Sequence, residues 1–203
     1  ETGTAVMETN RLAHPDRIAL ISPPWPLYTR PSIQIGALKA FVRSRFPAVE
    51  VSAHHVYLRV AEAIGFKQYH AISERTWLAE SVFAALLYPD RAEMIARLFR
   101  REASGNPELR GMDFARLAAR VEAVTEEWMS CTNWGNFRLL GFTSVLCQLT
   151  ACLYLIRKLK QRYPRLTMAV GGSAFSAESA PAALKLFPEI DVVVFGEGEL
   201  PLA

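Results

Sequence analysis

Residues 139–152, LLGFTSVLCQLTAC, and residues 166–175, LTMAVGGSAF, decide the fold class. In each stretch a short apolar run, typical of a buried strand, stops at small or hydroxyl residues: Ser144 after the first run and a pair of glycines after the second. The intervening segment, residues 146–163, has the apolar periodicity of a helix. Strand, helix and strand in this order predict a parallel βαβ unit with a right-handed crossover.

The same alternation is present at both ends of the chain. Apolar runs bounded by proline, glycine or serine predict three more strands, at residues 17–22, 49–58 and 190–199, the second of them leading into a loop. Helices are expected at about 33–45, with Ser32 as its cap, and at 179–188. We therefore expect an α/β fold with a doubly wound (Rossmann or flavodoxin-like) five-stranded parallel sheet.

A long helical stretch interrupts this alternation. It is too long for an ordinary crossover, so we expect an inserted helical subdomain at about residues 58–130. Its predicted helices are 73–88, capped by Ser73 with Trp77, Leu78, Val82 and Leu86 facing inward; 90–105, with an Asp90–Glu93 capping box; and 114–130, capped by Asp113.

Composition excludes several classes of protein. The chain has 203 residues, of which 51% are hydrophobic, and a net charge of +3 from scattered basic residues, which argues against a nucleic-acid partner. No apolar run reaches the ~18 residues of a membrane span, and no signal peptide is recognisable, so a cytoplasmic location without membrane contact is expected. Cys131, Cys147 and Cys152 predict buried thiols rather than disulfides. Residues 1–16 are interpreted as leader or added sequence.

Three strand ends carry small or hydroxyl residues. Ser144 alone is equally typical of a helix cap, and each glycine group alone is equally typical of a tight turn. Together they predict a slot at the carboxyl edge of the sheet, where ligands of parallel sheets bind. The slot residues are Ser144, Gly171, Gly172, Gly196, Glu197 and Gly198. Neither the dinucleotide motif G-x-G-x-x-G after the first strand nor a phosphate-binding G-x-x-x-x-G-K-[ST] motif is present.

Taken in order, these segments resemble the cobalamin-binding domain of radical S-adenosylmethionine enzymes. Ser144-x-Leu146 followed by Gly171-Gly172 is similar to two parts of the corrinoid signature. PPWPLYTRPSIQIGALKAF (23–41) and GGSAFSAESAPAALKLFPEIDVVVFGEGE (171–199) resemble the family's opening and closing segments. Residues 52–90 resemble, more specifically, the branch that matures ribosomally made peptides (RiPPs). The similarity covers about residues 17–203.

The resemblance implies a set of cofactor contacts. Ser144 would meet the nucleotide tail of cobalamin, and Gly171 and Gly172 would clear a channel for it. The corrin ring would lie on the strand ends. The implied contacts are Trp25, Tyr28, Arg30, Ser144, Val145, Leu146, Gly171, Gly172, Ser173, Gly196, Glu197 and Gly198. The loop after the first strand lacks the D-x-H-x-x-G histidine that ligates cobalt in many corrinoid proteins, so base-off cobalamin without a histidine ligand is expected.

The resemblance also implies that this chain is one part of a larger enzyme, whose catalytic groups lie elsewhere. The C-x-x-x-C-x-x-C motif that holds a [4Fe–4S] cluster in radical enzymes is absent. We therefore expect an N-terminal module with no catalytic or metal-ligating residues of its own. The radical barrel, S-adenosylmethionine and the cluster would belong to the parent, which the resemblance implies is a peptide C-methylating enzyme with a precursor peptide as partner. The alternative is a cobalamin-free scaffold that docks such a peptide.

The remaining polar candidates have plainer interpretations. His54 and His55 follow or end the second predicted strand and are interpreted as surface or supporting histidines, because no two histidines show metal-ligand spacing on a helix face. Glu197 and Glu199 lack a neighbouring base or nucleophile in the sequence, and we interpret them as loop contacts to a ligand or to the barrel.

Overall fold

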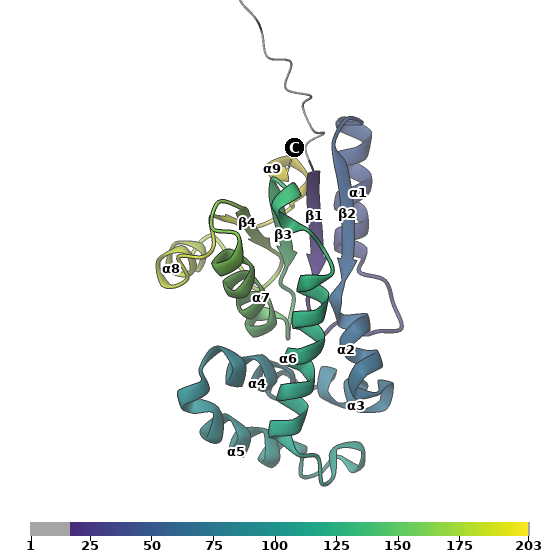
Figure 1. Cartoon of the computed structure of the whole chain (residues 1–203), viewed down its shortest axis with the longest axis vertical. Helices are drawn as coiled ribbons and strands as arrows, with labels where there is room; N and C mark the ends of the chain where they lie inside the picture. Colours follow the sequence, from purple (N-terminus) through teal and green to yellow (C-terminus); the bar gives the residue numbers. More distant parts are fainter. Residues whose placement is uncertain (1–16, 203) are drawn as a thin grey trace, which may run out of the picture.

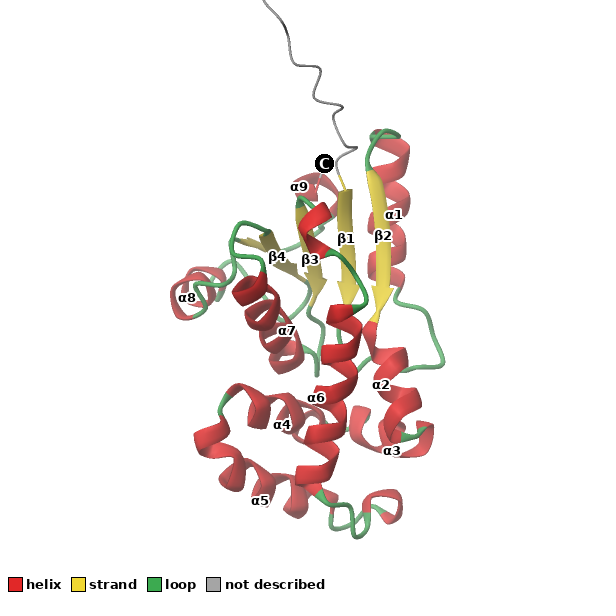
Figure 2. Cartoon of the chain, viewed as in Figure 1, coloured by secondary structure: helices red, strands yellow, loops and turns green. Residues whose placement is uncertain are grey.

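The computed structural model describes residues 17–202, without the side chains of Leu200 and Leu202. The interpretation of residues 1–16 as leader lies outside the described residues. Five parallel strands form one sheet in the order β2-β1-β3-β4-β5 (Figures 1 and 2). They are β1 (Arg17–Ser22), β2 (Glu50–His55), β3 (Leu139–Thr143), β4 (Thr167–Gly171) and β5 (Val192–Val194). The predicted fold class is confirmed.

Alternating side chains of β1 face opposite layers of the molecule. Leu20 packs with Ile35 and Val42 of helix α1 (Ile33–Arg45) in one apolar cluster. Ala19 and Ile21 belong to a second, larger cluster that includes helix α7 (Leu149–Arg162). Helices therefore cover both faces of the sheet, as the doubly wound fold requires. Two further helices, α8 (Ala180–Leu186) and α9 (Glu199–Leu202), flank β5 in sequence.

The helical insertion lies beyond the carboxyl ends of the strands (Figure 1). It begins directly at the end of β2 and consists of α2 (Val56–Ile64), α3 (Phe66–Ser73), α4 (Thr76–Leu87), α5 (Ala92–Ala103) and α6 (Phe114–Ser130). Its apolar residues belong to the same buried cluster as those of β1, β3 and β4. The insertion and the sheet thus share one core, so the insertion is held at the edge of the sheet where a ligand would bind.

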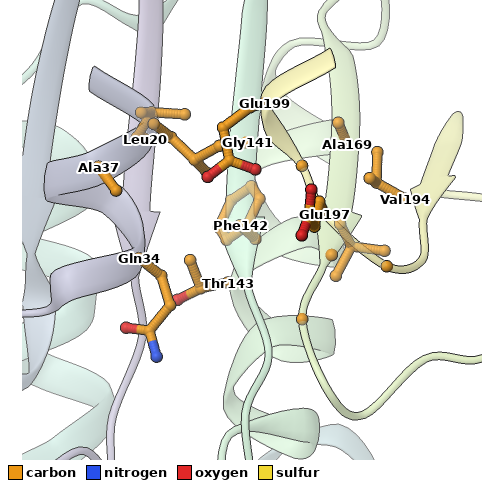
Figure 3. Close-up of a pocket in the computed structure, with 16 residues that line it drawn as sticks. Leu20, Gln34, Ala37, Gly141, Phe142, Thr143, Ala169, Val194, Glu197 and Glu199 are labelled. Atoms are coloured by element: carbon orange, nitrogen blue, oxygen red, sulfur yellow. The ribbon is translucent and has the colours of Figure 1, made fainter. Parts of the chain in front are cut away.

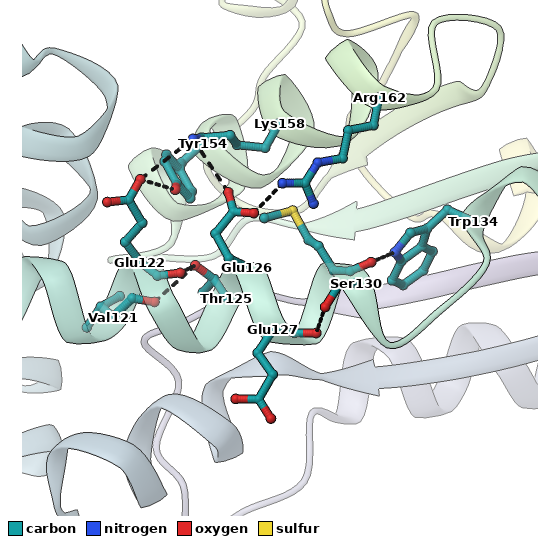
Figure 4. A network of polar contacts seen from close by, with 11 residues as sticks. Val121, Glu122, Thr125, Glu126, Glu127, Ser130, Trp134, Tyr154, Lys158 and Arg162 are labelled. Atoms are coloured by element: carbon teal, nitrogen blue, oxygen red, sulfur yellow. Dashed lines mark hydrogen bonds and ion pairs between the residues drawn. The ribbon is translucent and has the colours of Figure 1, made fainter.

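Charged side chains fix α6 against α7 (Figure 4). Lys158 of α7 lies 3.6 Å from a carboxylate oxygen of Glu122 and 3.5 Å from one of Glu126 on α6. Arg162 also pairs with Glu126, and the Tyr154 hydroxyl donates to Glu122 at 3.2 Å. These groups are partly buried, and several charges share partners, which is the arrangement in which ion pairs contribute most to stability.

Two of the predicted helix caps occupy the right position, but only one of them makes the hydrogen bond. The Asp113 carboxylate accepts hydrogen bonds from the main-chain N–H groups of Ala115 and Arg116 at the start of α6. Ser32 is the N-cap residue of α1, yet its hydroxyl donates to the side chain of Gln34 instead of accepting from the helix.

The other two predicted caps are wrong. Ser73 is the last residue of α3, where its hydroxyl donates to the carbonyl of His70. Asp90 lies in a 3₁₀ turn before α5 and pairs with Arg91, so the expected capping box is not formed. Serine and aspartate also bond to nearby carbonyls and cations in turns, and sequence alone does not separate the two uses.

Three other local expectations are corrected. The loop predicted after the second strand is helix α2. Trp77, expected to face inward, is 62% exposed, whereas Leu78 and Val82 are fully buried. Helix α7 begins at Leu149 rather than at residue 146, because residues 144–148 form a loop.

Two further expectations concern the burial of the cysteines and the absence of a membrane-spanning helix. Cys147 and Cys152 are buried and Cys131 is exposed, so the prediction of buried thiols is wrong for Cys131; none of the three forms a disulfide. Burial raises the pKa of the Cys152 thiol, and the nearby Glu80 raises it further. Within residues 17–202, no helix is long and apolar enough to cross a membrane.

Candidate functional site

A cavity of about 280 Å³ lies between α1 and the sheet, toward the carboxyl ends of β3, β4 and β5. Figure 3 shows Gln34 and Ala37 of α1 on one side of it and Glu197 and Glu199 on the other. Its lining residues are Leu20, Gln34, Ala37, Leu38, Gly141, Phe142, Thr143, Ala169, Val170, Gly171, Gly172, Val194, Gly196, Glu197, Gly198 and Glu199. The cavity brings together five of the predicted slot residues: Gly171, Gly172, Gly196, Glu197 and Gly198.

The strand register explains why this space is empty of side chains. Gly141 of β3 pairs with Ala169 of β4, and Thr143 pairs with Gly171. Paired residues of a parallel sheet face the same side, so these four small residues, two of them glycines, form a continuous floor of the cavity. Larger side chains at these positions would fill the space under α1. The sequence LGFT in β3 and MAVG in β4 therefore encodes the cavity.

The loops after β3 and β4 are joined at Ser144. Its main-chain N–H donates to the carbonyl of Gly171 at 2.7 Å, and its carbonyl accepts from the N–H of Ala174 at 3.1 Å. Gly172 has a φ of +116°, and a Cβ atom on it would lie 2.5 Å from the Ser144 carbonyl oxygen. Only glycine fits this position. Gly172, which also lines the cavity, is thus required for the two loops to meet.

The side chain of Ser144 is the most informative polar group at this edge. The residue is fully buried and does not line the cavity, and its Oγ atom has no hydrogen-bond partner among residues 17–202. It does not cap α7, which begins five residues later with Gln148 as its N-cap residue. Buried polar atoms without partners are rare in folded proteins, and each calls for an explanation such as a ligand or a bound water. Ser22, at the end of β1, has a second such hydroxyl.

Polar groups occupy the rim of the cavity rather than its floor. Gln34, Glu197 and Glu199 contribute the longer polar side chains among the lining residues. Gly198 lies close to α1, because a Cβ atom on it would be 3.3 Å from a methyl group of Leu38. Ser173, predicted as a contact, is exposed and does not line the cavity.

The three predicted ligand contacts in the first loop differ in how far they are buried. Trp25 is only 3% exposed, and its ring packs 5.0 Å from that of Tyr69 and 6.2 Å from that of Phe83. Trp25 is therefore a core residue and does not present its ring to a ligand, which corrects the expectation. Tyr28 is half-buried, with its ring 4.9 Å from that of Phe66. Arg30 is exposed at the end of the loop.

Two polar side chains that the sequence analysis missed hold this region together. The amide of Gln148 donates to the carbonyl of Pro23 at 2.6 Å and accepts from the N–H of Val145 at 3.0 Å, so it joins the first loop to the loop after β3. The Glu80 carboxylate of α4 accepts from the first N–H groups of α7, those of Leu149 at 3.0 Å and Thr150 at 2.8 Å. In the sequence, each of these two residues can be recognised as a polar residue within a mostly apolar segment.

The loop after β3 also presents an apolar side chain to solvent. Leu146 is 81% exposed and has a φ of +47°, an uncommon conformation for a residue with a side chain. The next residue, Cys147, places its sulfur 3.5 Å from the Thr76 hydroxyl at the start of α4. Val145, which precedes Leu146 in this loop, is half-buried. The carboxyl edge therefore has an exposed apolar surface beside the cavity.

His54 and His55 do not line this cavity. They are the last two residues of β2, and the His54 ring lies 5.0 Å from that of Trp134, with Nε2 3.0 Å from the Ser52 hydroxyl. Among residues 17–202, no group of three or more His, Cys, Asp or Glu side chains is placed to hold a metal ion. Comparison with protein-family models, with curated proteins and with solved structures found no match to this chain.

Proposed function

We propose that this domain binds cobalamin, with the nucleotide tail in the cavity under α1 and the corrin ring on the carboxyl edge of the sheet. One observation carries the proposal. A cavity with a floor of small residues lies next to the loop of Ser144, whose hydroxyl is fully buried, does not itself line the cavity and has no partner among the described residues. A ligand segment that is mostly apolar and offers one hydrogen-bonding atom would complete such a site.

The size of the cavity favours the tail rather than a whole ligand. Pockets for complete small molecules usually measure about 300–1,000 Å³. At about 280 Å³ this cavity suits one aromatic base with part of its linker. The apolar floor, formed by residues such as Ala169 and Leu20, suits the flat face of such a base, and the polar rim suits its sugar.

The exposed apolar edge beside the cavity suits the broad corrin ring. Leu146 presents its side chain there, and Arg30 is exposed on the neighbouring loop. The loops that carry these residues are fixed: Gln148 joins them, and the Tyr57 hydroxyl donates to the Arg30 carbonyl at 3.1 Å. A site with fixed loops loses little conformational entropy when a ligand binds.

The function of the module follows from this arrangement. We infer that it presents cobalamin to a radical S-adenosylmethionine barrel, which would modify a ribosomally made peptide, most simply by C-methylation. Bound cobalamin would supply the reactive cobalt centre that carries the methyl group. The residues of this chain would bind the tail, orient the ring and exclude water from one of its faces. A cluster and S-adenosylmethionine would be held elsewhere in the parent.

The test compares two corrinoids that differ only in the tail. The protein is incubated with hydroxocobalamin or with cobinamide, which has the corrin ring but no nucleotide tail, and is then separated from unbound corrinoid by gel filtration. We expect stoichiometric cobalamin, visible by absorbance, and binding of cobinamide that is at least tenfold weaker. Equal binding of both would contradict the tail assignment. Binding of neither would favour the alternative, a scaffold that docks a peptide without cobalamin.

A further inference from the structure

A second cavity, of about 320 Å³, lies at the outer edge of the sheet, away from the one described above. It is formed by the end of β2 with His54 and His55, by Arg59 of α2, and by Cys131 and Thr132 just after α6. Most of these side chains can donate hydrogen bonds, and none of the lining residues is a carboxylate. The proposed cobalamin site does not use any of them.

The cations around this cavity form no ion pair within the described part of the chain. Arg59 forms no ion pair with any residue in 17–202, and neither does Lys39 of α1, whose charge acts on both histidines. Two carboxylates of α6, those of Glu122 and Glu126, are engaged with α7 on the other side of that helix (Figure 4). Positive charge therefore accumulates at the cavity without an internal partner.

One carboxylate on α6 needs separate treatment. Glu127 lies one turn before Cys131 and points away from α7 (Figure 4), and it forms no ion pair among the described residues. Two of the main-chain carbonyl groups at this end of α6 already accept hydrogen bonds within the protein. Glu127 accepts from the Cys131 N–H and the Ser130 hydroxyl, and Met129 accepts from the Trp134 ring N–H at 2.8 Å. Because these carbonyl oxygens already accept hydrogen bonds, they repel a nearby anion less.

A ring nitrogen of one lining residue also lacks a partner. The Nδ1 atom of His55 is buried and has no hydrogen-bond partner among the described residues. Burial lowers the pKa of His55, and Lys39 lowers it further. Burial likewise lowers the pKa of His54, with smaller contributions from His55, Arg59 and Lys39 in that order. A bound anion would reverse the electrostatic part of these shifts, since a nearby negative charge favours the protonated imidazole.

We propose that this cavity is a binding site for a phosphate-class oxyanion, such as a phosphate monoester, held by Arg59, His55 and Thr132. Donors from the end of β2, from α2 and from the segment after α6 surround the cavity from different directions. A tetrahedral oxyanion with several acceptor oxygens can accept from all of them, whereas a planar carboxylate offers two oxygens in one plane. The cavity is larger than a single phosphate, which leaves room for an ester group.

The test uses inorganic phosphate and the ring proton signals of the histidines. The protein without corrinoid is titrated with phosphate at constant ionic strength near neutral pH, and the signals of His54 and His55 are assigned with His54→Gln and His55→Gln. We expect both signals to shift saturably toward the protonated position. The signal of His70, which lies 3.3 Å from Glu74 on α3 and outside the cavity, serves as an internal control and should not shift.

Two variants with opposite expected effects on the phosphate affinity test where the anion binds. Arg59→Gln should weaken phosphate binding at least tenfold, because a charge-assisted hydrogen bond is lost. The matched control, Arg110→Gln, removes an exposed arginine near the far end of the insertion and should leave the affinity unchanged. Glu127→Gln should strengthen binding severalfold, because it removes a carboxylate one helical turn before Cys131 that is not engaged with α7.

Three results would overturn the proposal: no saturable shift, an equal loss of affinity in Arg59→Gln and Arg110→Gln, or acetate binding as tightly as phosphate. Because cobalamin is absent from these measurements, their failure would leave the proposed cofactor site untouched.

Discussion

The carbonyl oxygen of Ser144 and the α-carbon of Gly172 approach so closely that a Cβ atom on Gly172 would lie 2.5 Å from that oxygen. The contact joins the loops that follow β3 and β4, and the Ser144 hydroxyl beside it is buried without a partner. One glycine thus sets the position of the group that we propose to bind the cofactor tail. Several predictions about the site depend on this relationship.

Replacing Gly172 should destabilise the protein rather than only block a ligand. Gly172→Ala introduces a side chain at a φ of +116° and against the Ser144 carbonyl. We expect the free energy of unfolding to fall by about 2 kcal/mol or more, measured by chemical denaturation. The control is Gly36→Ala in α1, where a Cβ atom would meet nothing within 4 Å. It should be neutral or raise the stability by about 1 kcal/mol. Equal stability of the two variants would contradict this account of Gly172.

Removing the Ser144 hydroxyl should separate binding from stability. Because this buried hydroxyl has no partner, Ser144→Ala should leave the free energy of unfolding of the corrinoid-free protein unchanged or higher. The same variant should weaken cobalamin about two- to tenfold, the cost of one hydrogen bond. Ser81→Ala, which removes a buried hydroxyl bonded to the Leu78 carbonyl in α4, should not change the affinity. Unchanged affinity in Ser144→Ala would remove Ser144 from the site.

The Glu80 carboxylate should stabilise the attachment of the insertion to the sheet. Glu80→Gln keeps the size of the side chain, but its amide group would face an N–H of Leu149 or Thr150 that now meets a carboxylate oxygen. We expect a loss of about 1–3 kcal/mol in the free energy of unfolding. Glu108→Gln, at an exposed position far from α7, is the matched control and should change the stability by less than about 0.5 kcal/mol. An effect no larger than that of the control would show that the contact is unimportant.

The cobalt of bound cobalamin should have no protein imidazole ligand. The loop after β1 contains no histidine, and His55 lies at the end of the edge strand β2, outside the cavity. Because Tyr28 packs against Phe66, Arg30 is the more available side chain to shield the lower face of the corrin. Electron paramagnetic resonance of the Co(II) form should therefore lack nitrogen superhyperfine splitting. A splitting that disappears in His55→Gln would show that histidine is the ligand.

The sheet was predictable from sequence because β1, β3, β4 and β5 are short, largely apolar runs that stop at small, hydroxyl or glycine residues. The less apolar β2, EVSAHH, was predictable from its place after Pro47 in a strand–helix–strand order. The glycine groups at the ends of β4 and β5 were sufficient to predict that Gly171, Gly196 and Gly198 would meet at one cavity. Both inferences rest on local pattern together with the rule that parallel strands end at a common edge.

Contacts between distant segments were not predictable in this way. Trp25 was expected at the ligand because the resemblance to cobalamin-binding domains implies corrin contacts from the first loop, but the inserted helices supply Tyr69 and Phe83, which bury it. The α1 side of the cavity was missed because Gln34 looks like an ordinary polar helix position and Ala37 like part of the apolar face with which the helix packs on the sheet. Their role depends on the small residues of β3 and β4, which lie more than a hundred positions away along the chain.

The most direct test of the central claim fills the cavity from α1. Ala37 and Ala40 are both exposed alanines of α1, but only Ala37 lines the cavity. Cobalamin affinity is measured by equilibrium dialysis for Ala37→Trp and Ala40→Trp, with circular dichroism to establish that both variants are folded. If the tail occupies the cavity, Ala37→Trp weakens cobalamin at least tenfold and Ala40→Trp leaves it unchanged. Equal affinity in the two variants, with binding at the level of the unmodified protein, would contradict the claim.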